Sequence, residues 1–558
     1  MKESIVELLA KDTNIKKEEI EKLLEIPPIQ DMGDYAFPCF SLSKKFKKNP
    51  NEISLDLAMK LTKQLEKYKE IEKIENIGGY VNFFINKKTF TKKILSQALV
   101  DEFGTAKENN KILIEHTSVN PNASPHVGRA RNAIIGDSIV RILRFMGNKV
   151  ETHYYVNDVS KQVAMLALVY KKGQTFDDML KNYVEISKKI EKNPELEKKA
   201  LDLLEKFEKE EGETTKLFRE IVGICVSGQR EIFEKFGIKF DYFDYESKYM
   251  GKRSGDLLKK FESSGKLFKD NEGRLVLDLS HTSLIRKMKS PVFVLARSNG
   301  TGLYGLRDIT YTIEKMKKTK GKNGRNIIIL GEDQKLYFEQ IKEALKILNY
   351  AAPEVVHYSF VLLQDNEGKA KKMSTRRGEL VLLGEFYNEA LKRAERIIKE
   401  KKAKGDPEKI ALAAIKYAML KNDNDKNIIF SWNQSLNFEG DSGPYMQYSY
   451  ARASSILKKI KNKKIKKYEI SNITDLEFKL IKKISEFQDI VKKASITLNP
   501  SIIAGYSFHL CQIFNEFYHS NKVIGDENEI FRAKLVEAFR KTIKKSLSLM
   551  GIDVMEEM

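Results

Sequence analysis

Cysteine is scarce in this chain of 558 residues, and long apolar runs are missing. The three cysteines, Cys39, Cys225 and Cys511, lie far apart and form no CxxC pair, which disfavours a disulfide framework and a structural zinc site. A membrane-spanning helix needs about 18 consecutive apolar residues, and no segment approaches that length. The first residues also lack the pattern of a secretion signal. We therefore expect a cytoplasmic protein without membrane contact and without a protein-held metal.

Acidic residues are fewer than basic ones. The 99 lysines and arginines outnumber the 78 aspartates and glutamates, which gives a formal net charge of +21. A field of this sign favours a polyanionic partner, and nucleic acid is the commonest one. Solvated charged helices in a lysine-rich protein are the alternative, and charge alone does not separate the two.

The length predicts roughly three or four domains. Residues 1–104 combine helical periodicity near residues 5–9 and 55–65 with an alternating stretch at residues 78–85, which predicts a strand entered through a glycine turn. This part is predicted to be an N-terminal α+β domain. The next part, residues 105–405, has a different pattern.

Two strand–helix–strand units are expected there. Their elements are strand 111–115, a helix from about 128, strand 150–156, and later strand 326–330, helix 335–348 and strand 355–363. Such units predict a Rossmann-type parallel sheet, with a charge-rich helical insertion at about 170–220 between the halves. After about residue 406 we expect helices only, including the basic run 458–467, so residues 406–558 are predicted to form an all-α domain. The fold class is multidomain α/β.

The first of two candidate ATP loops follows strand 111–115. It contains His126-Val-Gly-Arg129 at the start of a predicted helix. Gly128 allows close approach of an adenine to the backbone, and a helix N-terminus offers N–H groups to an anion. His126 can donate to a phosphate oxygen. Taken alone the tetrapeptide is a weak signal, because a histidine near a glycine is more often structural.

The second candidate loop is Lys371-Lys-Met-Ser-Thr-Arg-Arg-Gly378, after the last predicted strand of the second half. Lys372, Met373 and Ser374 lie at its centre with Arg376 behind them, so the loop offers positive charge that can close over a triphosphate. An exposed basic loop is the alternative. The sequence has no Walker A pattern, which disfavours a P-loop NTPase.

Both loops, in this order and at strand ends in opposite halves of one sheet, are a more specific signal. His126-Val-Gly-Arg129 resembles the HIGH motif of the class I aminoacyl-tRNA synthetases, and Lys372-Met-Ser-Thr375 resembles their KMSKS motif. The resemblance implies adenylation, in which an amino-acid carboxylate attacks the α-phosphorus of ATP and expels pyrophosphate, with Mg²⁺ accompanying the ATP. The implied catalytic residues are His126, Arg129 and Lys372. The implied ATP-binding residues are His126, Gly128, Arg129, Lys372, Met373 and Ser374.

Longer segments are similar to the arginyl-tRNA synthetases in their archaeal-like form. These segments are 114–121 (IEHTSVNP), 126–137 (HVGRARNAIIGD), 303–309 (LYGLRDI) and 438–448 (FEGDSGPYMQY). With residues 33–36 and 549–552 near the two ends, they extend the resemblance over nearly the whole chain. It implies an arginine–tRNA ligase that forms arginyl-adenylate and transfers the arginyl group to the 3′-end of tRNA(Arg).

The same resemblance implies six contacts to the substrate L-arginine, namely Glu115, Ser118, Asn120, Tyr304, Asp308 and Gln334. A guanidinium is always charged and presents five N–H donors, so its pocket needs carboxylates and neutral acceptors. Asp308 follows Tyr304 by four residues, which places both on one face if the segment is helical. Without the resemblance, an ion pair with a protein lysine is the simpler interpretation of Glu115, and a local pair with Arg307 is an equal interpretation of Asp308.

The sequence departs from the family motifs at a few positions. Arg129 stands where histidine is usual, which keeps a phosphate donor and adds fixed charge. Thr375 replaces the last lysine of the second motif. A lysine just before the first motif can take over its role in such enzymes, but that position is Ala123 in this chain, so the substitute is missing. Tyr337 stands where histidine is expected after Gln334. We expect Lys372 to carry the charge of the second motif.

The resemblance also implies how tRNA is bound. The N-terminal domain docks the tRNA elbow, and the helical C-terminal domain reads the anticodon, whose splayed bases stack on aromatic or apolar side chains. Tyr448, Tyr518 and Met558 are the candidates, and helix packing is the alternative for each. The family generally needs bound tRNA before it activates arginine. We expect a monomer.

Three other functions remain open at this stage. A class I synthetase for cysteine or glutamate is disfavoured by the absence of metal-ligand cysteines and by the acidic pocket. A tRNA-binding paralogue without catalytic activity is supported only by Arg129 and Thr375. A small-molecule nucleotidyltransferase of the same fold would not need the basic helical region at the C-terminal end.

Overall fold

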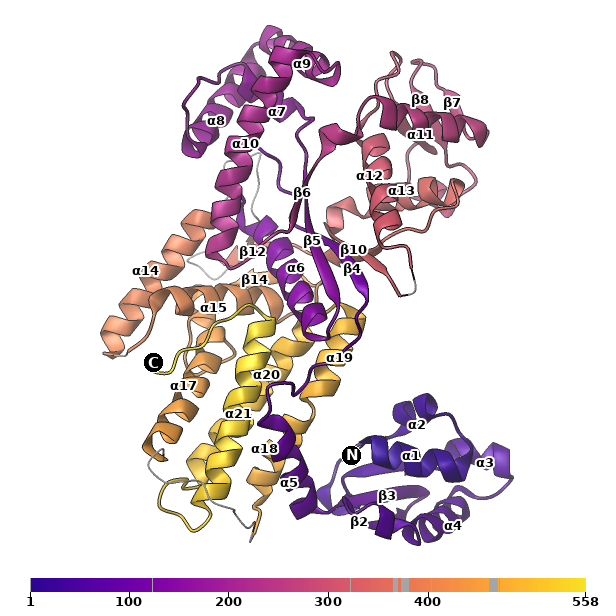
Figure 1. Ribbon diagram of the computed structural model, residues 1–558, viewed down its shortest axis with the longest axis vertical. Coiled ribbons are helices and arrows are strands. Elements are labelled where there is room, and N and C mark those ends of the chain that lie inside the picture. Colours follow the sequence, from indigo (N-terminus) through magenta and orange to yellow (C-terminus); the bar gives the residue numbers. More distant parts are fainter. Residues whose placement is uncertain are drawn as a thin grey trace. The chain divides into compact units, whose positions relative to one another are not determined.

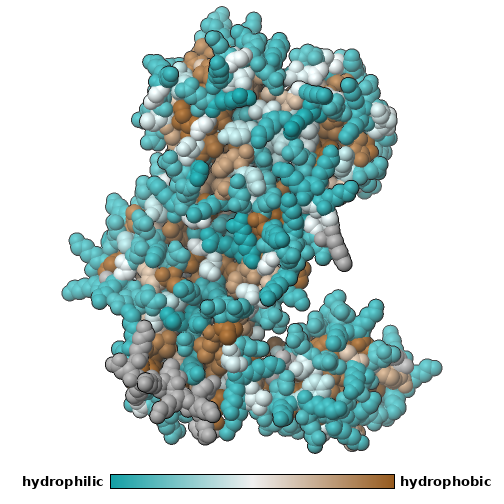
Figure 2. All heavy atoms as spheres, in the orientation of Figure 1, coloured by the Kyte–Doolittle hydropathy of each residue, from teal (hydrophilic) through white to brown (hydrophobic). Residues whose placement is uncertain are grey.

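The computed structural model describes residues 2–122, 124–321, 323–364, 370–372, 381–402, 404–460, 470 and 472–558 (Figure 1). Among these residues, none of the helices combines the length and the apolar character needed to span a bilayer. Hydrophilic side chains cover most of the face drawn in Figure 2, and hydrophobic ones appear on it as separate patches.

The chain divides into two compact units. The first contains Met1–Phe103, Ile456–Glu486 and Gln512–Thr542, and the second contains Gly104–Ser455, Phe487–Cys511 and Ile543–Met558. Each unit is therefore assembled from segments that are distant in the sequence, and the C-terminal helices contribute to both. The division into three domains at residues 104 and 405 stays a prediction.

An antiparallel sheet with helices forms the N-terminal part of the first unit. Its elements are α1 Lys2–Thr13, α2 Lys17–Leu23, β1 Tyr35–Pro38, α3 Phe40–Phe46, α4 Pro50–Thr62, β2 Ile71–Ile77, β3 Tyr80–Ile85 and α5 Lys87–Ala98. The strand order is β1-β3-β2. Gly78 and Gly79 form the hairpin turn with φ of 55° and 82°, a region in which a side chain would clash with the backbone. The predicted α+β character is confirmed.

Five parallel strands form the central sheet of the second unit: β4 Lys111–Glu115, β5 Lys149–Val156, β6 Tyr242–Tyr245, β10 Arg325–Gly331 and β11 Glu354–Tyr358. Their order is β11-β10-β4-β5-β6. Helix α6 (Val127–Phe145) connects β4 to β5, and α13 (Lys335–Ile347) connects β10 to β11, so both predicted strand–helix–strand units are confirmed. From β4 the chain adds β5 and β6 toward one edge of the sheet, and it then adds β10 and β11 toward the other edge, so the strand order reverses between β4 and β10. Such a reversal opens a crevice for ligands at the carboxyl ends of the strands.

Two smaller sheets lie outside the central one. They contain β7 Leu267–Lys269, β8 Leu275–Asp278 and β9 Val292–Ala296, and then β12 Val361–Gln364, β13 Ala370–Lys372 and β14 Ile428–Phe430. The single strand expected at residues 355–363 is therefore wrong, because β11 and β12 belong to different sheets. The break is at Ser359, whose carbonyl accepts from the buried Arg131 at 2.7 Å and whose hydroxyl donates to Glu332 at 2.6 Å. These side-chain interactions replace the strand pairing at this position.

Helices fill the long connections of the second unit. They are α7 Lys161–Ala167, α8 Phe176–Lys192, α9 Pro194–Glu208, α10 Gly212–Lys235, α11 Lys252–Ser263 and α12 Tyr304–Lys318, with the 3-10 turns η3 Glu246–Tyr249 and η5 Glu332–Gln334. The helical insertion expected at about 170–220 corresponds to α8, α9 and the first part of α10 (Figure 1). Helix α12 follows the sheet of β7, β8 and β9 and carries several of the candidate site residues.

The last part of the chain is almost entirely helical. Its helices are α14 Leu383–Lys401, α15 Pro407–Leu420, α16 Trp432–Ser435, α17 Gly443–Ile460, α18 Asp475–Ser485, α19 Phe487–Thr497, α20 Ser501–Ser520 and α21 Glu529–Leu549. The expectation of helices only after residue 406 is wrong for β14, which pairs in parallel with β12. Ile428 and Phe430 of this strand are buried, so the extended segment stabilises an apolar sheet edge.

Candidate active site

The candidate site begins where β4 ends at the centre of the parallel sheet. Glu115 is the last residue of this strand and is buried. Thr117 and Ser118 follow with φ of 79° and 46°, which is unusual for residues that carry a side chain and most unusual for a β-branched one. The amide of Thr117 donates to the Asn132 side chain at 2.8 Å, which fixes this conformation. Strained backbone that the surrounding structure maintains is typical of functional sites.

Two further predicted arginine contacts lie in the same segment. The Ser118 hydroxyl oxygen is buried and has no hydrogen-bond partner among the described residues. Asn120 is exposed, and its carbonyl accepts from Gln229 at 2.8 Å. The first of these groups is therefore available to a bound ligand, whereas the backbone of the second is engaged by α10.

The first motif begins helix α6, as predicted. His126 is the N-cap residue, and its Nδ1 atom is buried without a partner among the described residues. Burial, together with the charge of Arg129, lowers the pKa of His126 to about 4. The imidazole is therefore neutral near pH 7 and can donate one hydrogen bond. Gly128 and Arg129 follow in the first turn and are partly exposed.

The helix N-terminus is less open than the sequence suggested. The amide of Val127 donates to the carbonyl of Val381 at 3.1 Å, and the amide of Leu383 donates to the carbonyl of Pro125 at 2.7 Å. His126 and Leu382 form the isolated antiparallel bridge between these two bonds. The chain that leaves the second loop is therefore fixed against the first motif. One of the N–H groups expected to face an anion is already used.

The second motif follows a different sheet from the one expected. Lys372 is the last residue of β13, which pairs antiparallel with β12 rather than extending the central parallel sheet. That part of the prediction is wrong, because the chain leaves the central sheet at Ser359. The side chain of Lys372, and Met373, Ser374, Thr375 and Arg376 altogether, lie outside the described residues, as does Ala123.

Helix α12 brings Tyr304 and Asp308 together, as their spacing predicts. Tyr304 is the first residue of the helix and is 56% exposed, whereas Asp308 one turn later is only partly exposed. The ring of Tyr304 lies 5.3 Å from the ring of Tyr337 in α13. The Tyr337 hydroxyl donates to Oδ2 of Asp308 at 2.5 Å. Tyr337, which stands where histidine was expected, is therefore part of the candidate pocket.

Asp308 has an unusual environment for a carboxylate. Burial raises its pKa to about 6, and the hydrogen bond from Tyr337 opposes this shift only in part. Among the described residues, Asp308 forms no ion pair within 4 Å, and the expected alternative of a local pair with Arg307 is not what the structure contains. Arg307 instead donates to the buried Glu246 at 2.6 Å. Asp308 is thus a partly buried acid without an ion pair among the described residues.

Glu115 differs from Asp308 because it has a cation of its own. Its carboxylate forms an ion pair with Nζ of Lys315, and the two side chains are 7% and 1% exposed. This is the ion pair with a protein lysine that was the simpler interpretation of Glu115. The carboxylate of Glu115 also lies close enough to Asp308 to raise the pKa of that group. Glu115 therefore lies near Asp308, but its charge is already compensated.

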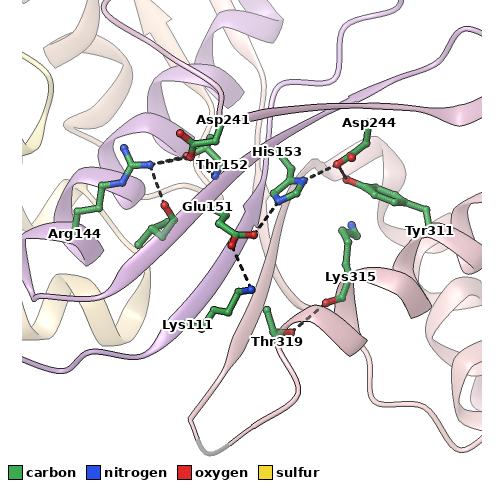
Figure 3. A network of polar contacts seen from close by, with 11 residues as sticks. Lys111, Arg144, Glu151, Thr152, His153, Asp241, Asp244, Tyr311, Lys315 and Thr319 are labelled. Carbon is green, nitrogen blue, oxygen red and sulfur yellow. Dashed lines mark hydrogen bonds and ion pairs between the residues drawn. The ribbon is translucent and has the colours of Figure 1, made fainter. Parts of the chain in front are cut away.

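A polar network continues from Lys315 across the sheet (Figure 3). The Lys315 ammonium lies 4.2 Å from the ring centre of Tyr311, whose hydroxyl donates to Oδ2 of Asp244 at 2.8 Å. The same oxygen lies 2.6 Å from Nδ1 of His153, and Nε2 of His153 lies 3.6 Å from Glu151. Burial is the largest single influence on the pKa of Asp244 and raises it, but the hydrogen bonds from His153 and Tyr311, together with nearby positive charge, outweigh burial and lower the pKa. The network fixes the ring of Tyr311 beside Lys315.

Gln334, like Ser118 and Asn120, is a predicted arginine contact that the described hydrogen bonds do not connect to this group. It ends the turn η5, immediately before α13, and its side chain is partly buried. None of the described hydrogen bonds joins it to Asp308 or Glu115. Its predicted role depends on a bound ligand.

The predicted anticodon residues are only partly accessible. Tyr448 is half-buried, and the guanidinium of Arg452 lies 4.9 Å from its ring centre. Tyr518 is 37% exposed and contacts His519, with 5.5 Å between ring centres. Met558 is half-buried at the end of the chain. Residues 461–467 of the basic run lie outside the described residues.

Sequence reasoning missed Lys315, Tyr311 and Tyr337 as parts of the site. The signal for the first two was present, because they continue the face of Tyr304 and Asp308 at helical spacing. What the spacing does not reveal is the partner of Lys315, which lies 200 residues away in the chain.

Three regions of the chain match known protein families. Residues 92–432 match the family described as tRNA synthetases class I (R), catalytic domain, residues 446–558 match the DALR anticodon binding domain, and residues 1–85 match the arginyl tRNA synthetase N terminal domain. Curated relatives named arginine–tRNA ligase include those of Methanocaldococcus jannaschii, 36% identical over 99% of this chain and 97% of the relative, and Clostridium perfringens, 32% identical over 100% of both chains.

Solved structures give the same result. The arginyl-tRNA synthetase of Thermus thermophilus is similar with a TM-score of 0.79 and 27% identity, covering 100% of this chain and 99% of that one. The order of the three matched regions follows the order of the elements described above. The chain therefore belongs to the class I arginyl-tRNA synthetases.

Proposed function

We propose that Asp308 binds the guanidinium of arginine in this ligase. The observation that carries the proposal is its burial beside Glu115 and Tyr337 without a cation among the described residues. A buried carboxylate of this kind is costly unless a positive group pairs with it. An arginine side chain supplies that group with a planar set of donors. Tyr304, Ser118, Asn120 and Gln334 are proposed to complete the pocket, with acceptor oxygens for the remaining donors.

ATP is proposed to bind at the N-terminus of α6. Gly128 permits close approach of the adenine, while His126 and Arg129 donate to the triphosphate. The support is the unpartnered Nδ1 of His126 and the backbone pairing that places residues 381–383 against this motif. Lys372, Met373 and Ser374 are proposed to reach the triphosphate from the second loop. Mg²⁺ enters on the phosphates of ATP and needs no metal-binding cluster in the protein.

The reaction needs positioning more than covalent help from the protein. The arginine carboxylate attacks the α-phosphorus in line, the bond to the bridging oxygen breaks, and pyrophosphate leaves. A hydroxyl at the tRNA 3′-end then attacks the carbonyl of the adenylate and releases AMP. Donors such as Arg129 and Lys372 stabilise the charge that develops on the leaving phosphates. The neutral imidazole of His126 contributes a hydrogen bond without changing the net charge.

Recognition of tRNA is proposed to use both ends of the chain. The N-terminal domain docks the elbow, and Tyr448, Tyr518 and Met558 contact the anticodon. The excess of basic residues supports phosphate contacts along the tRNA. We further propose that arginine activation requires bound tRNA. The protein is proposed to work as a cytoplasmic monomer, and its three free buried cysteines fit a reducing compartment.

One experiment tests the substrate and the tRNA requirement together. Aminoacylation of unfractionated tRNA is measured with each of the twenty amino acids, and arginine-dependent ATP–pyrophosphate exchange is measured with and without tRNA. Charging with arginine alone, and exchange only in the presence of tRNA, is expected. Charging with another amino acid or no charging at all would contradict the proposed substrate. Exchange without tRNA would contradict only the tRNA requirement.

A further inference from the structure

Four side chains of α12 lie along one face of the helix. Tyr304, Asp308, Tyr311 and Lys315 are separated by four, three and four residues, which is the spacing of neighbours on a helix surface. Lys315 follows Asp308 by two turns, or roughly 10 Å along the axis. The same face therefore carries the carboxylate of Asp308 and, two turns later, the buried ammonium of Lys315.

Lys315 is held in place from two sides. Its side chain is 1% exposed, its Nζ pairs with the carboxylate of Glu115, and the ring of Tyr311 lies 4.2 Å from it. Tyr311 is fixed in turn by its hydrogen bond to Asp244, as Figure 3 shows. An ammonium so enclosed has lost its freedom of movement. The structure thus contains a fixed positive charge directly beside the proposed substrate pocket.

The other acids around the pocket also have fixed partners. Glu246 accepts from Arg307 at 2.6 Å, and Asp244 has His153 and Tyr311. Asp158 is 3% exposed and accepts from a backbone amide at 2.9 Å. Asp308 is both partly exposed and without an ion pair among the described residues. With Glu115 neutralised by Lys315, Asp308 is the acid on this face of α12 that is partly exposed and has no ion pair among the described residues.

We propose that Lys315 is a positioning residue for arginine recognition, which neutralises and orients Glu115 so that Asp308 alone takes the substrate charge. The inference rests on the proposed function of Asp308 and Glu115 in the pocket. A guanidinium has one charge but five N–H donors, so it needs one anion and additional acceptors. A carboxylate has about four lone-pair sites, and Glu115 can accept from the substrate while Lys315 holds it.

The groups that face Glu115 show why its orientation depends on Lys315. Helix α12 contributes Lys315, Tyr311 and Asp308, and the turn η3 contributes Tyr249. Beside Glu115 in the sheet lie His153 of β5 and the apolar Ile328 of β10. Lys315 is the one lysine or arginine of this set. Without it, the buried carboxylate of Glu115 loses the ammonium that holds it.

Separate measurement of the arginine KM and the ATP KM distinguishes this role from a purely structural one. Lys315→Met is expected to raise the arginine KM about tenfold, because Glu115 loses the ammonium that orients it, while the ATP KM stays at the wild-type value. Lys315→Arg, which keeps the charge, should restore most of the wild-type affinity for arginine.

Two controls accompany this measurement. Lys317→Met makes the same substitution two residues further along α12 at an exposed position, and its arginine KM should stay at the wild-type value. Lys315→Met combined with Glu115→Gln removes both charges, so the arginine KM of the double variant should be no higher than that of Glu115→Gln alone. If Lys315→Met does not fold, Lys315→Gln, which can donate to Glu115 without a charge, provides the same test.

The outcomes distinguish this inference from the function on which it rests. An unchanged arginine KM in Lys315→Met or Lys315→Gln overturns the role of Lys315, and so does an equal rise of the ATP KM. Asp308→Asn is measured in parallel. If that variant keeps the wild-type arginine KM, the proposed pocket itself is wrong. A raised arginine KM for Asp308→Asn together with an unchanged one for Lys315→Met overturns only the inference about Lys315.

Discussion

Two buried ion pairs, one in each unit, show how similar contacts serve different purposes. In the C-terminal helices, Arg532 donates to Glu477 at 2.6 Å, and both side chains are almost fully buried. Arg532 also donates to the Lys522 carbonyl at 2.7 Å, and Glu477 accepts from the Thr474 amide at 2.7 Å. Both members of this pair therefore have further hydrogen-bond partners within the protein.

The pair of Glu115 and Lys315 differs in its neighbour rather than in its own geometry. Asp308 lies close enough for the charge of Glu115 to raise its pKa, and none of the described residues supplies Asp308 with an ion pair. A buried ion pair by itself is therefore no evidence for a functional site. The informative feature is the acid that the fold leaves without a cation. Four predictions test this difference, from the largest expected effect to the smallest.

Breaking the ion pair between Arg532 and Glu477 should lower the stability of the protein and leave arginine binding unchanged. Arg532→Met leaves the carboxylate of Glu477 buried without its cation, so the free energy of unfolding is expected to fall by about 3–5 kcal/mol. Denaturant unfolding of the purified protein measures it. Arg396→Met removes an exposed pair with Glu400 and should cost less than about 1 kcal/mol. Equal effects of the two substitutions would show that burial does not distinguish these pairs.

Removing the unpaired acid should affect substrate binding instead. Asp308→Ala is expected to raise the arginine KM about 100-fold, because a charged hydrogen-bonded pair contributes about 2–5 kcal/mol. The ATP KM should remain unchanged. Steady-state aminoacylation at varied arginine and ATP concentrations measures both constants. Asp256→Ala, at an exposed position of α11, is the matched control. An unaltered arginine KM would remove Asp308 from the pocket.

The raised pKa of Asp308 predicts a pH dependence of arginine binding. The ionised carboxylate binds the guanidinium, and the pKa of this group is about 6 in the folded protein. The arginine KM should therefore be constant above pH 7 and rise about tenfold for each pH unit well below pH 6. His126, whose pKa is about 4, stays neutral over most of this range, so the ATP KM should change little. Kinetics between pH 5 and 8 measure both; an arginine KM that does not rise in acid would contradict the prediction.

The smallest effect is expected from the hydroxyl that holds Asp308. Tyr337→Phe removes one hydrogen bond to the Asp308 carboxylate while keeping the ring, which corresponds to about 1.5 kcal/mol or roughly a tenfold rise in arginine KM. kcat should stay close to the wild-type value. Tyr350→Phe, at a partly buried position just after α13, is the control. A change in kcat without a change in KM would mean that the Tyr337 hydroxyl acts on the reaction rather than on the pocket.

Local patterns in the sequence predicted the elements that carry the site. The apolar periodicity of residues 111–156 gave β4, α6 and β5 correctly, and the spacing of Tyr304 and Asp308 placed them on one face of a helix. Local patterns did not predict the break between β11 and β12. That break depends on Ser359 contacting Arg131, which lies 228 residues away in the chain. An alternating apolar segment reads the same whether it forms one strand or two.

The residue types and their spacing alone determined that this chain has a parallel nucleotide-binding sheet, a histidine at the start of its first helix and an acid on the face of α12. Helix and strand periods repeat over a few residues, so a short segment of the sequence is enough to predict these features. Only the tertiary structure decided which acids are paired. Lys315 neutralises Glu115, Arg307 neutralises Glu246, and Asp308 is left without a described cation. The energy of a buried charge depends on whatever the fold places around it, and those neighbours come from segments far apart in the chain.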